Sequence, residues 1–209
     1  MDDSRLMALV HAVVADDADA TSRLLAASPE LSRAQFGTGA SRQAAKSYFI
    51  EEIGRYLYAG DTALHFAAAG YRERLVRALL DAGADVEAQN RRGARPLHAA
   101  AVGTPGACHW DPPAQAATIA WLIKAGADPN GVDKSGVTPL HRAVRTRCAA
   151  AVAALLDGGA DAQRRNGNGS TPMLLAILNT DRGGSGSPEA KAQQQEIVRL
   201  LERYGAKHP

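Results

Sequence analysis

The sequence has few aromatic residues, only two cysteines and no long apolar run. Aromatic residues make up 5% of its 209 residues, although 45% are hydrophobic. No run of about 18 apolar residues exists to cross a membrane, and the first residues are acidic, so we expect no membrane segment, no signal peptide and a cytoplasmic location. The net charge of +2 is close to neutral, so bulk charge gives no argument for nucleic acid as a ligand.

Two short motifs recur along the chain in register. The first motif starts a helix and reads TALH at 62–65, RPLH at 95–98, TPLH at 138–141 and TPML at 171–174. The second ends a helix and reads LLDAGAD at 79–85, LIKAGAD at 122–128 and LLDGGAD at 155–161. His65 and His98 are 33 residues apart, and so are His141 and Leu174, whereas His98 and His141 are 43 apart. The chain therefore repeats with a 33-residue period, and one repeat carries ten inserted residues.

Each recurring residue type suits its position. Thr138 and Thr171 can cap a helix through the hydroxyl, and the proline that follows each occupies the first helical position, where no amide hydrogen is needed. The glycine of the second motif suits the left-handed position that ends a helix. Turn residues at 90–93, 133–136 and 166–169 predict hairpins between the repeats.

A 33-residue period that carries T-P-L-H resembles the ankyrin repeat, and the resemblance covers nearly the whole chain. It implies one all-α repeat solenoid over residues 1–209, with about five repeats of two helices and a hairpin turn. The register predicts these segments: an N-terminal capping repeat 5–35, an insertion 36–59, a repeat 60–92, a repeat 93–136 with an inter-helix insertion, a repeat 137–169 and a C-terminal capping repeat 170–209. The capping role fits Val10, which replaces the histidine, and Glu202, which replaces a stacking leucine.

The histidines at the motif position are His65, His98 and His141. The resemblance implies that each imidazole bonds backbone and threonine hydroxyl between neighbouring hairpins. Their spacing follows the repeat, so we expect neither a metal site nor a catalytic role, and we expect no cofactor.

The insertion at 36–59 holds five of the ten aromatic residues of the chain. Phe49, Ile53, Tyr56 and Leu57 fall at helical spacing, which predicts a helix with one apolar face. This face would dock the insertion onto the first repeats. Tyr48 and Tyr58 would remain outside it as anchors for a partner, because tyrosine is enriched in interface hot spots.

The second insertion, 103–113, lies between two helices. We expect Asp111 to cap the next helix and Trp110 to pack on it, with an exposed Trp110 as the alternative. Cys108, His109 and Asp111 could ligate a metal but are too close in sequence to converge on one ion. Cys108 and Cys148 fall in corresponding regions of consecutive repeats. A disulfide is conceivable, but a cytoplasmic chain favours free thiols.

The resemblance places partner-binding residues at the hairpin tips and on the inner helical face. In this register they are Gln89, Arg91, Arg92, Val102, Val132, Lys134, Ser135, Arg145, Arg165 and Asn168. None is acidic, so we expect a monomeric, non-catalytic module that binds an acidic segment of a protein partner. Nucleic acid is disfavoured, since the basic tips lack a stacking platform. The alternative is an enzyme or small-ligand-binding protein whose pocket is closed by the 36–59 insertion.

Overall fold

The structure, a computed structural model, describes residues 3–41, 43–107, 110–178 and 188–208. Its helices α1 to α10 have these bounds in order: Asp3–Val14, Ala18–Ala27, Ala63–Ala69, Glu73–Asp81, Pro96–Ala100, Pro112–Lys124, Pro139–Arg145, Ala149–Asp157, Pro172–Ile177 and Pro188–Arg203. Strands β1 (Phe49–Ile50) and β2 (Arg55–Tyr56) form a two-stranded antiparallel sheet. Short 3-10 turns span Pro29–Ser32, Lys46–Tyr48 and Glu51–Ile53. Within the described ranges, no helix is both long and apolar enough to cross a membrane.

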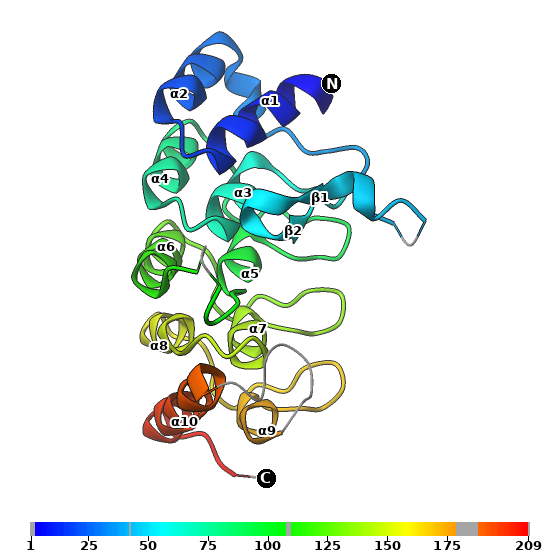
Figure 1. Ribbon diagram of the computed structural model, residues 1–209. Coiled ribbons are helices and arrows are strands. Elements are labelled where there is room, and N and C mark those ends of the chain that lie inside the picture. The colour runs from blue at the N-terminus through cyan, green and yellow to red at the C-terminus, as the bar shows by residue number, and fades with distance from the viewer. Residues whose placement is uncertain (1–2, 42, 108–109, 179–187, 209) are drawn as a thin grey trace.

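The helices stack in two parallel columns, with the two termini at opposite ends (Figure 1). Helices α1, α3, α5, α7 and α9 form the inner column, and α2, α4, α6, α8 and α10 form the outer one. Each helix packs on the other helix of its own repeat and on the equivalent helices of the adjacent repeats. This nearest-neighbour packing defines a solenoid, and the all-α repeat architecture predicted from the sequence is confirmed.

The core is built from the faces that the repeat motifs present. On α4, Leu75, Val76 and Leu79 are buried at i, i+1 and i+4, and Leu79 is fully buried. The inner helices α3 and α5 bury several alanines, whose small side chains let neighbouring repeats approach closely, and Phe66 is the largest side chain buried there. At the array ends, Val10 is fully buried in place of a histidine, whereas Glu202 is exposed to solvent.

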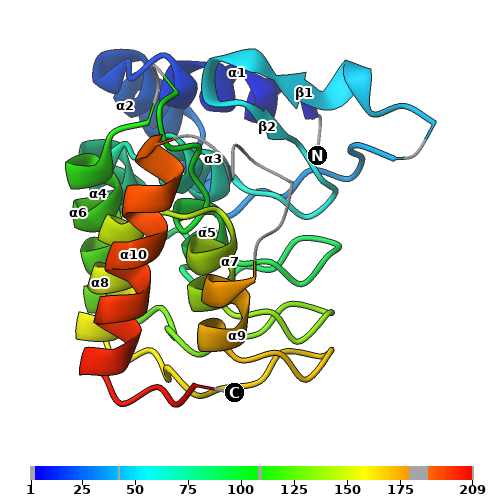
Figure 2. The same cartoon turned by 60° about the horizontal axis from the view of Figure 1, so that its bottom comes forward.

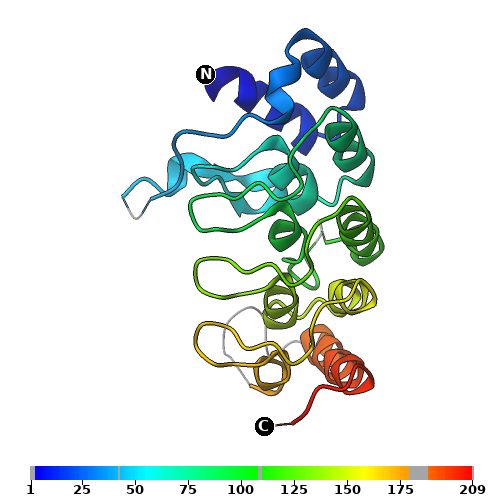
Figure 3. The ribbon, with the colours of Figure 1, turned by 180° about the vertical axis from the view of Figure 1, so that it is seen from behind.

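Long hairpin loops, called fingers here, project from the inner column and stack on one another (Figure 3). Their tips lie at 90–94, 133–137 and 166–170. Gly93, Gly136 and Gly169 have φ of 73°, 68° and 78°, the left-handed conformation that closes each turn at little cost only for glycine. The hairpin turns predicted at these positions are therefore confirmed.

The helix predicted within the first insertion is wrong, because β1 and β2 form a hairpin there. Gly54 has a φ of 58°, which ends the 3-10 turn between the strands. Strand geometry sends alternate side chains to opposite faces. As a result Ile50 and Leu57 are buried, whereas Phe49 and Tyr56, which were expected to dock, are 40% and 39% exposed. The hairpin lies on the same side of the solenoid as the fingers (Figure 2).

The second insertion leads into α6 as expected. Asp111 caps this helix by accepting from the Ala114 amide at 3.0 Å. Trp110 is half-buried, and its indole N–H donates to Gln115 at 3.0 Å, so it packs on the helix. The thiol of Cys148 is free and buried. The expectations for Cys108 and His109 lie outside the described residues.

Candidate functional site

The finger tips are held by a side chain at the first turn position. Asn90 Oδ1 accepts from the amides of Arg92 at 2.9 Å and Ala94 at 3.1 Å. Asp133 and Asn166 make the equivalent bonds in the next two fingers. Single backbone bonds then link successive tips: Lys134 N donates to Arg92 O and Gly167 N to Ser135 O, both at 3.0 Å. These tips therefore present a fixed row of side chains.

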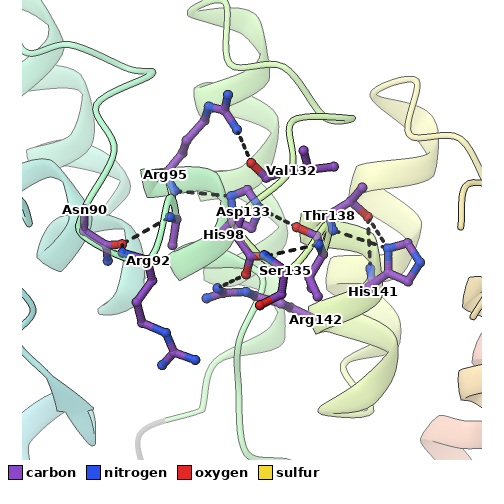
Figure 4. A network of polar contacts seen from close by, with 12 residues as sticks. Asn90, Arg92, Arg95, His98, Val132, Asp133, Ser135, Thr138, His141 and Arg142 are labelled. Atoms are coloured by element: carbon purple, nitrogen blue, oxygen red, sulfur yellow. Dashed lines mark hydrogen bonds and ion pairs between the residues drawn. The ribbon is translucent and has the colours of Figure 1, made fainter. Parts of the chain in front are cut away.

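Each motif histidine joins the start of its own helix to the next finger. The Arg95 amide donates to His98 Nδ1 at 3.3 Å, so the ring proton sits on Nε2, which donates to Val137 O at 2.9 Å (Figure 4). His65 and His141 bond in the same way to Ala94 O at 3.0 Å and Ser170 O at 3.1 Å. The hydroxyls of Thr62 and Thr138 also contact Nδ1 of their histidines.

Burial keeps these imidazoles neutral. It lowers the pKa of His65 to about 4, although Asp61 Oδ1 lies 3.8 Å from Nε2 and acts in the opposite direction. Burial together with the charge of Arg142 lowers the pKa of His98 to about 3. Burial also lowers the pKa of His141. Both ring nitrogens are used in structural bonds, so the three histidines are not available as a base or ligand in the folded protein.

Asp61 fixes the insertion to the first repeat. Its fully buried carboxylate accepts from Arg55 Nη2 at 3.0 Å, Asn90 Nδ2 at 2.9 Å and the Tyr58 amide at 2.8 Å. Removing one partner of a buried ion pair typically costs about 3–5 kcal/mol, because the other charge is left uncompensated. Asp61 thus connects the hairpin, the first finger and the start of α3.

Tyr58 contacts two arginines of the first finger. The guanidinium carbons of Arg91 and Arg92 are 5.5 and 5.2 Å from its ring centroid. Arg92 Nη1 also donates to the Tyr58 hydroxyl at 3.2 Å, and Arg91 donates to Ala40 O. Cation–π contacts of this kind contribute about 0.5–1 kcal/mol when exposed. Two of the basic tip residues therefore also hold the insertion in place.

The insertion covers part of the inner helical face and forms with it a partly open pocket of about 210 Å³. Its wall is formed by hairpin residues, the ends of α3 and α5, the first finger and α7, including Arg55, Tyr56, Tyr58, Tyr71, Arg92, Val102 and Arg142. Arg142 is bound by Asp133 Oδ2 at 2.8 Å, and its side chain is 14% exposed. Figure 4 shows Arg92 and Arg142 directed to the same side of the finger, while Arg95 points away toward Val132.

Comparison with known protein families agrees with this geometry. Residues 114–208 match the family model for ankyrin repeats in three copies, and residues 59–91 match the model for a single ankyrin repeat. The chain belongs to the ankyrin-repeat family. No curated protein matches it. Ankyrin repeats are generally protein–protein interaction modules, and the family is typically non-catalytic.

In this ankyrin array, the tip residues proposed from the sequence form one row. Gln89, Arg91, Arg92, Lys134, Ser135, Arg165 and Asn168 are exposed, and Val132 is half-buried. Val102 and Arg145 are exposed at the ends of inner helices α5 and α7. The two tyrosines proposed as anchors differ from this expectation. Tyr48 is half-buried against the core and Tyr58 is engaged by the arginines, so neither is the most exposed ring of the insertion.

Sequence reasoning missed Arg55, Asp61 and Arg142. Two of them were recognisable from the ankyrin register. In the other repeats, the position equivalent to Asp61 holds Ala94, Val137 or Ser170. The position equivalent to Arg142 holds Phe66, Ala99 or Leu175. A charge at a position that is otherwise small or apolar indicates a local partner. Among the described residues, no group of three or more histidine, cysteine, aspartate or glutamate side chains could hold a metal.

Proposed function

We propose that this protein is a monomeric, non-catalytic interaction module that binds an acidic segment of a protein partner. The binding surface consists of the finger tips, the inner helical face and the insertion hairpin. The observation that carries the proposal is an exposed pair of aromatic rings beside a row of basic tips. The Phe49 and Tyr56 rings contact each other with their planes tilted by 54° and their centroids 4.8 Å apart, while the two residues remain 40% and 39% exposed.

The two parts of this surface serve different purposes. Exposed aromatic rings that a partner desolvates supply most of the affinity in many interfaces. Basic side chains at the rim mainly raise the association rate and select partners of opposite charge. Lys134 and Arg165 are exposed in the fingers, Arg145 is exposed at the end of α7, and none of the three has an ion-pair partner within the described ranges. The anchor is therefore assigned to Phe49 and Tyr56, in place of Tyr48 and Tyr58.

Affinity capture from native lysate, followed by mass spectrometry, would identify partners, and purified partners would then be titrated against variants. Replacing Phe49 and Tyr56 by alanine should weaken binding by about thirtyfold or more, since hot-spot truncations cost about 2 kcal/mol. Lys134→Glu with Arg145→Glu should slow association in low salt. The matched control is Arg74→Glu on the outer helix α4, which should change neither the affinity nor the association rate. A partner whose affinity survives the first two changes binds elsewhere, and the edge around Trp110 becomes the candidate.

The pocket under the insertion is the observation that favours the alternative, a small-ligand-binding protein. Its volume of about 210 Å³ is below the roughly 300–1,000 Å³ typical of drug-sized ligand sites. Saturable binding of a metabolite-sized molecule that also raises the melting temperature would support the alternative over the interaction module.

A further inference from the structure

Three arginines from separate parts of the chain line one pocket. Arg55 comes from strand β2, Arg92 from the first finger and Arg142 from α7, and all three contribute to the wall. Burial lowers the pKa of Arg142, and the nearby charges of Arg55 and Arg92 act in the same direction. Guanidinium groups repel one another at short range, so such a cluster is costly without anions.

The protein supplies two carboxylates for three guanidiniums. Asp61 pairs with Arg55 and Asp133 with Arg142, each through one Nη2 atom. No ion pair to Arg92 is present in the part of the chain that the structure describes. Within the described residues, the three arginines of this pocket therefore carry one more positive charge than the two carboxylates paired with them, and a further carboxylate would balance it.

The shape of the pocket limits what that acceptor can be. A volume of about 210 Å³ suits one acidic side chain or a small anion. Tyr56, Tyr58 and Arg92 also line a second, wider depression of about 660 Å³ between the insertion and the first finger. An extended segment could therefore lie in the depression with one side chain entering the pocket. Free anions would leave the depression unfilled, which favours a polypeptide.

We propose that the pocket between Arg55, Arg92 and Arg142 binds a carboxylate side chain of the partner protein. This inference rests on the proposed function and adds a defined acceptor site to it. The guanidinium forks donate paired hydrogen bonds to the two carboxylate oxygens, a geometry that an amide cannot match in charge. Tyr56 lines both the pocket and the depression, and Phe49 packs against it, so this aromatic pair contacts the residues that flank the acidic side chain.

The first test uses a minimal probe and the full chain. Acetyl-Gly-Glu-Gly-amide is titrated at constant ionic strength while the arginine Nε–Hε NMR signals are recorded, with acetyl-Gly-Gln-Gly-amide as its neutral match. The Glu peptide should shift the Arg55 and Arg142 signals saturably and bind about tenfold tighter than the Gln peptide, as expected for charge-assisted bonds. Equal shifts with both peptides would overturn the proposal.

Three variants and a control separate the site from general charge. Arg142→Gln should lower the affinity for the Glu peptide by about tenfold. Arg92→Gln leaves no carboxylate unpaired and should lower this affinity by up to about fivefold. Asp133→Asn should tighten binding by up to about fivefold, because it removes the competing charge. Asparagine already occupies this turn position at Asn90 and Asn166, so the finger should stay folded. Arg74→Gln, an exposed arginine on the outer helix α4, should have no effect, and an equal loss there would overturn the site.

The Asp133→Asn variant matters most, since misfolding cannot increase affinity. A failure to tighten binding would contradict the proposal even if the other variants behaved as expected. Glutarate and inorganic phosphate are titrated in parallel. If either binds as tightly as the Glu peptide, while a captured partner keeps its affinity after its acidic residues are replaced by amides, the natural ligand is a small anion and the partner assignment is wrong.

The same measurements distinguish this inference from the proposed function. If a captured partner loses affinity on replacement of Phe49 and Tyr56 but not on Arg142→Gln or Asp133→Asn, the interaction module stands and the carboxylate pocket is wrong. The opposite outcome is that no protein binds the aromatic pair, whereas the Glu peptide binds the pocket saturably and Asp133→Asn raises its affinity. The carboxylate preference then stands and the interaction module is wrong.

Discussion

Nε2 of His98 lies 2.9 Å from the carbonyl oxygen of Val137, which is 39 residues further along the chain. The equivalent bonds from His65 and His141 span 29 residues. The difference is the ten-residue insertion between α5 and α6. Because the same bond forms despite the insertion, the insertion adds a loop without changing how one repeat packs on the next. In the repeat 170–209, Leu174 stands at the position of the histidine.

Stability should fall as the solution is acidified below about pH 6.5. An unfolded histidine has a pKa near 6.5, whereas burial lowers the folded pKa of His65 to about 4 and that of His98 to about 3. Between these values the unfolded state binds protons that the native state does not. Each histidine therefore removes up to about 1.4 kcal/mol of unfolding free energy per pH unit. Urea titrations at half-unit steps from pH 7 to pH 4 would measure the slope.

The variant His98→Leu provides the control for this slope. It places at this position the leucine that the last repeat has there. It should lower stability at pH 7, yet reduce the slope of stability against pH by the contribution of one histidine. An unchanged slope in His98→Leu would contradict the neutral buried imidazole.

Asp133 affects stability at lower pH. Although burial opposes it, the ion pair with Arg142 and the amides of Ser135 and Val137 lower its pKa, so its contribution is lost only as the pH falls below about 3.8.

Truncating the core of α4 should be costly. Leu79→Ala removes a fully buried side chain and should lower the free energy of unfolding by about 2–5 kcal/mol, the range for large-to-small core changes. The exposed Arg74 on the same helix provides a matched comparison, and Arg74→Ala should stay within about 0.5 kcal/mol of wild type. Equal effects of the two changes in chemical denaturation would show that the buried face of α4 is assigned incorrectly.

Cys148 should be unreactive in the folded protein. Its thiol is fully buried, and burial raises its pKa, which lowers the fraction of reactive thiolate. In a Cys108→Ser background, a chromogenic thiol reagent should label Cys148 slowly without denaturant and rapidly in guanidinium chloride. Rapid stoichiometric labelling of the native protein would mean that this region opens easily.

Tyr58 should hold the insertion more through its ring than through its hydroxyl. Tyr58→Phe keeps the ring that contacts Arg91 and Arg92, whereas Tyr58→Ala removes both cation–π contacts. The Ala40 amide, which donates to Leu57 O at 2.7 Å, reports on the docked hairpin. Its hydrogen exchange should accelerate strongly in Tyr58→Ala and only slightly in Tyr58→Phe. Similar exchange in all three proteins would show that Asp61 and the buried leucine suffice.

The repeats could be predicted because every level of the sequence specifies the same structure. Thr138 caps a helix, Pro139 follows at its first position and Gly159 ends the next helix, and each choice is local. The 33-residue period then fixes which elements stack. Tertiary contacts within a solenoid join neighbours, so local rules and the period determine most of the fold.

The insertion could not be predicted in the same way. Phe49, Ile53, Tyr56 and Leu57 have helical spacing, but the segment is short and contains Gly54 in a left-handed turn. In such a segment, burial of Ile50 and Leu57 against the first repeats outweighs intrinsic preference. Strand pairing then places Phe49 opposite Tyr56 and leaves both rings in solvent.

The arginine pocket could not be predicted from the sequence for a different reason. The register alone marks Asp61 and Arg142 as unusual, so each residue could have been identified. Their grouping could not, because Arg55, Arg92 and Arg142 are separated by 37 and 50 residues. They meet only because the hairpin folds back over the inner helices, and that path depends on the docking of the insertion.

The first insertion begins and ends at one point of the array. The Gly60 amide donates to Phe36 O at 2.8 Å, and the Phe36 amide donates to Asp61 O at 3.0 Å. Phe36 is itself buried, with its ring edge-on to Phe66 at 6.2 Å. The segment between them is thus a closed loop on a fixed base, and the entropy of closing such a loop changes slowly with its length. This junction is a natural grafting site, where loops of other sequence and size could be exchanged to give the same scaffold new binding specificities.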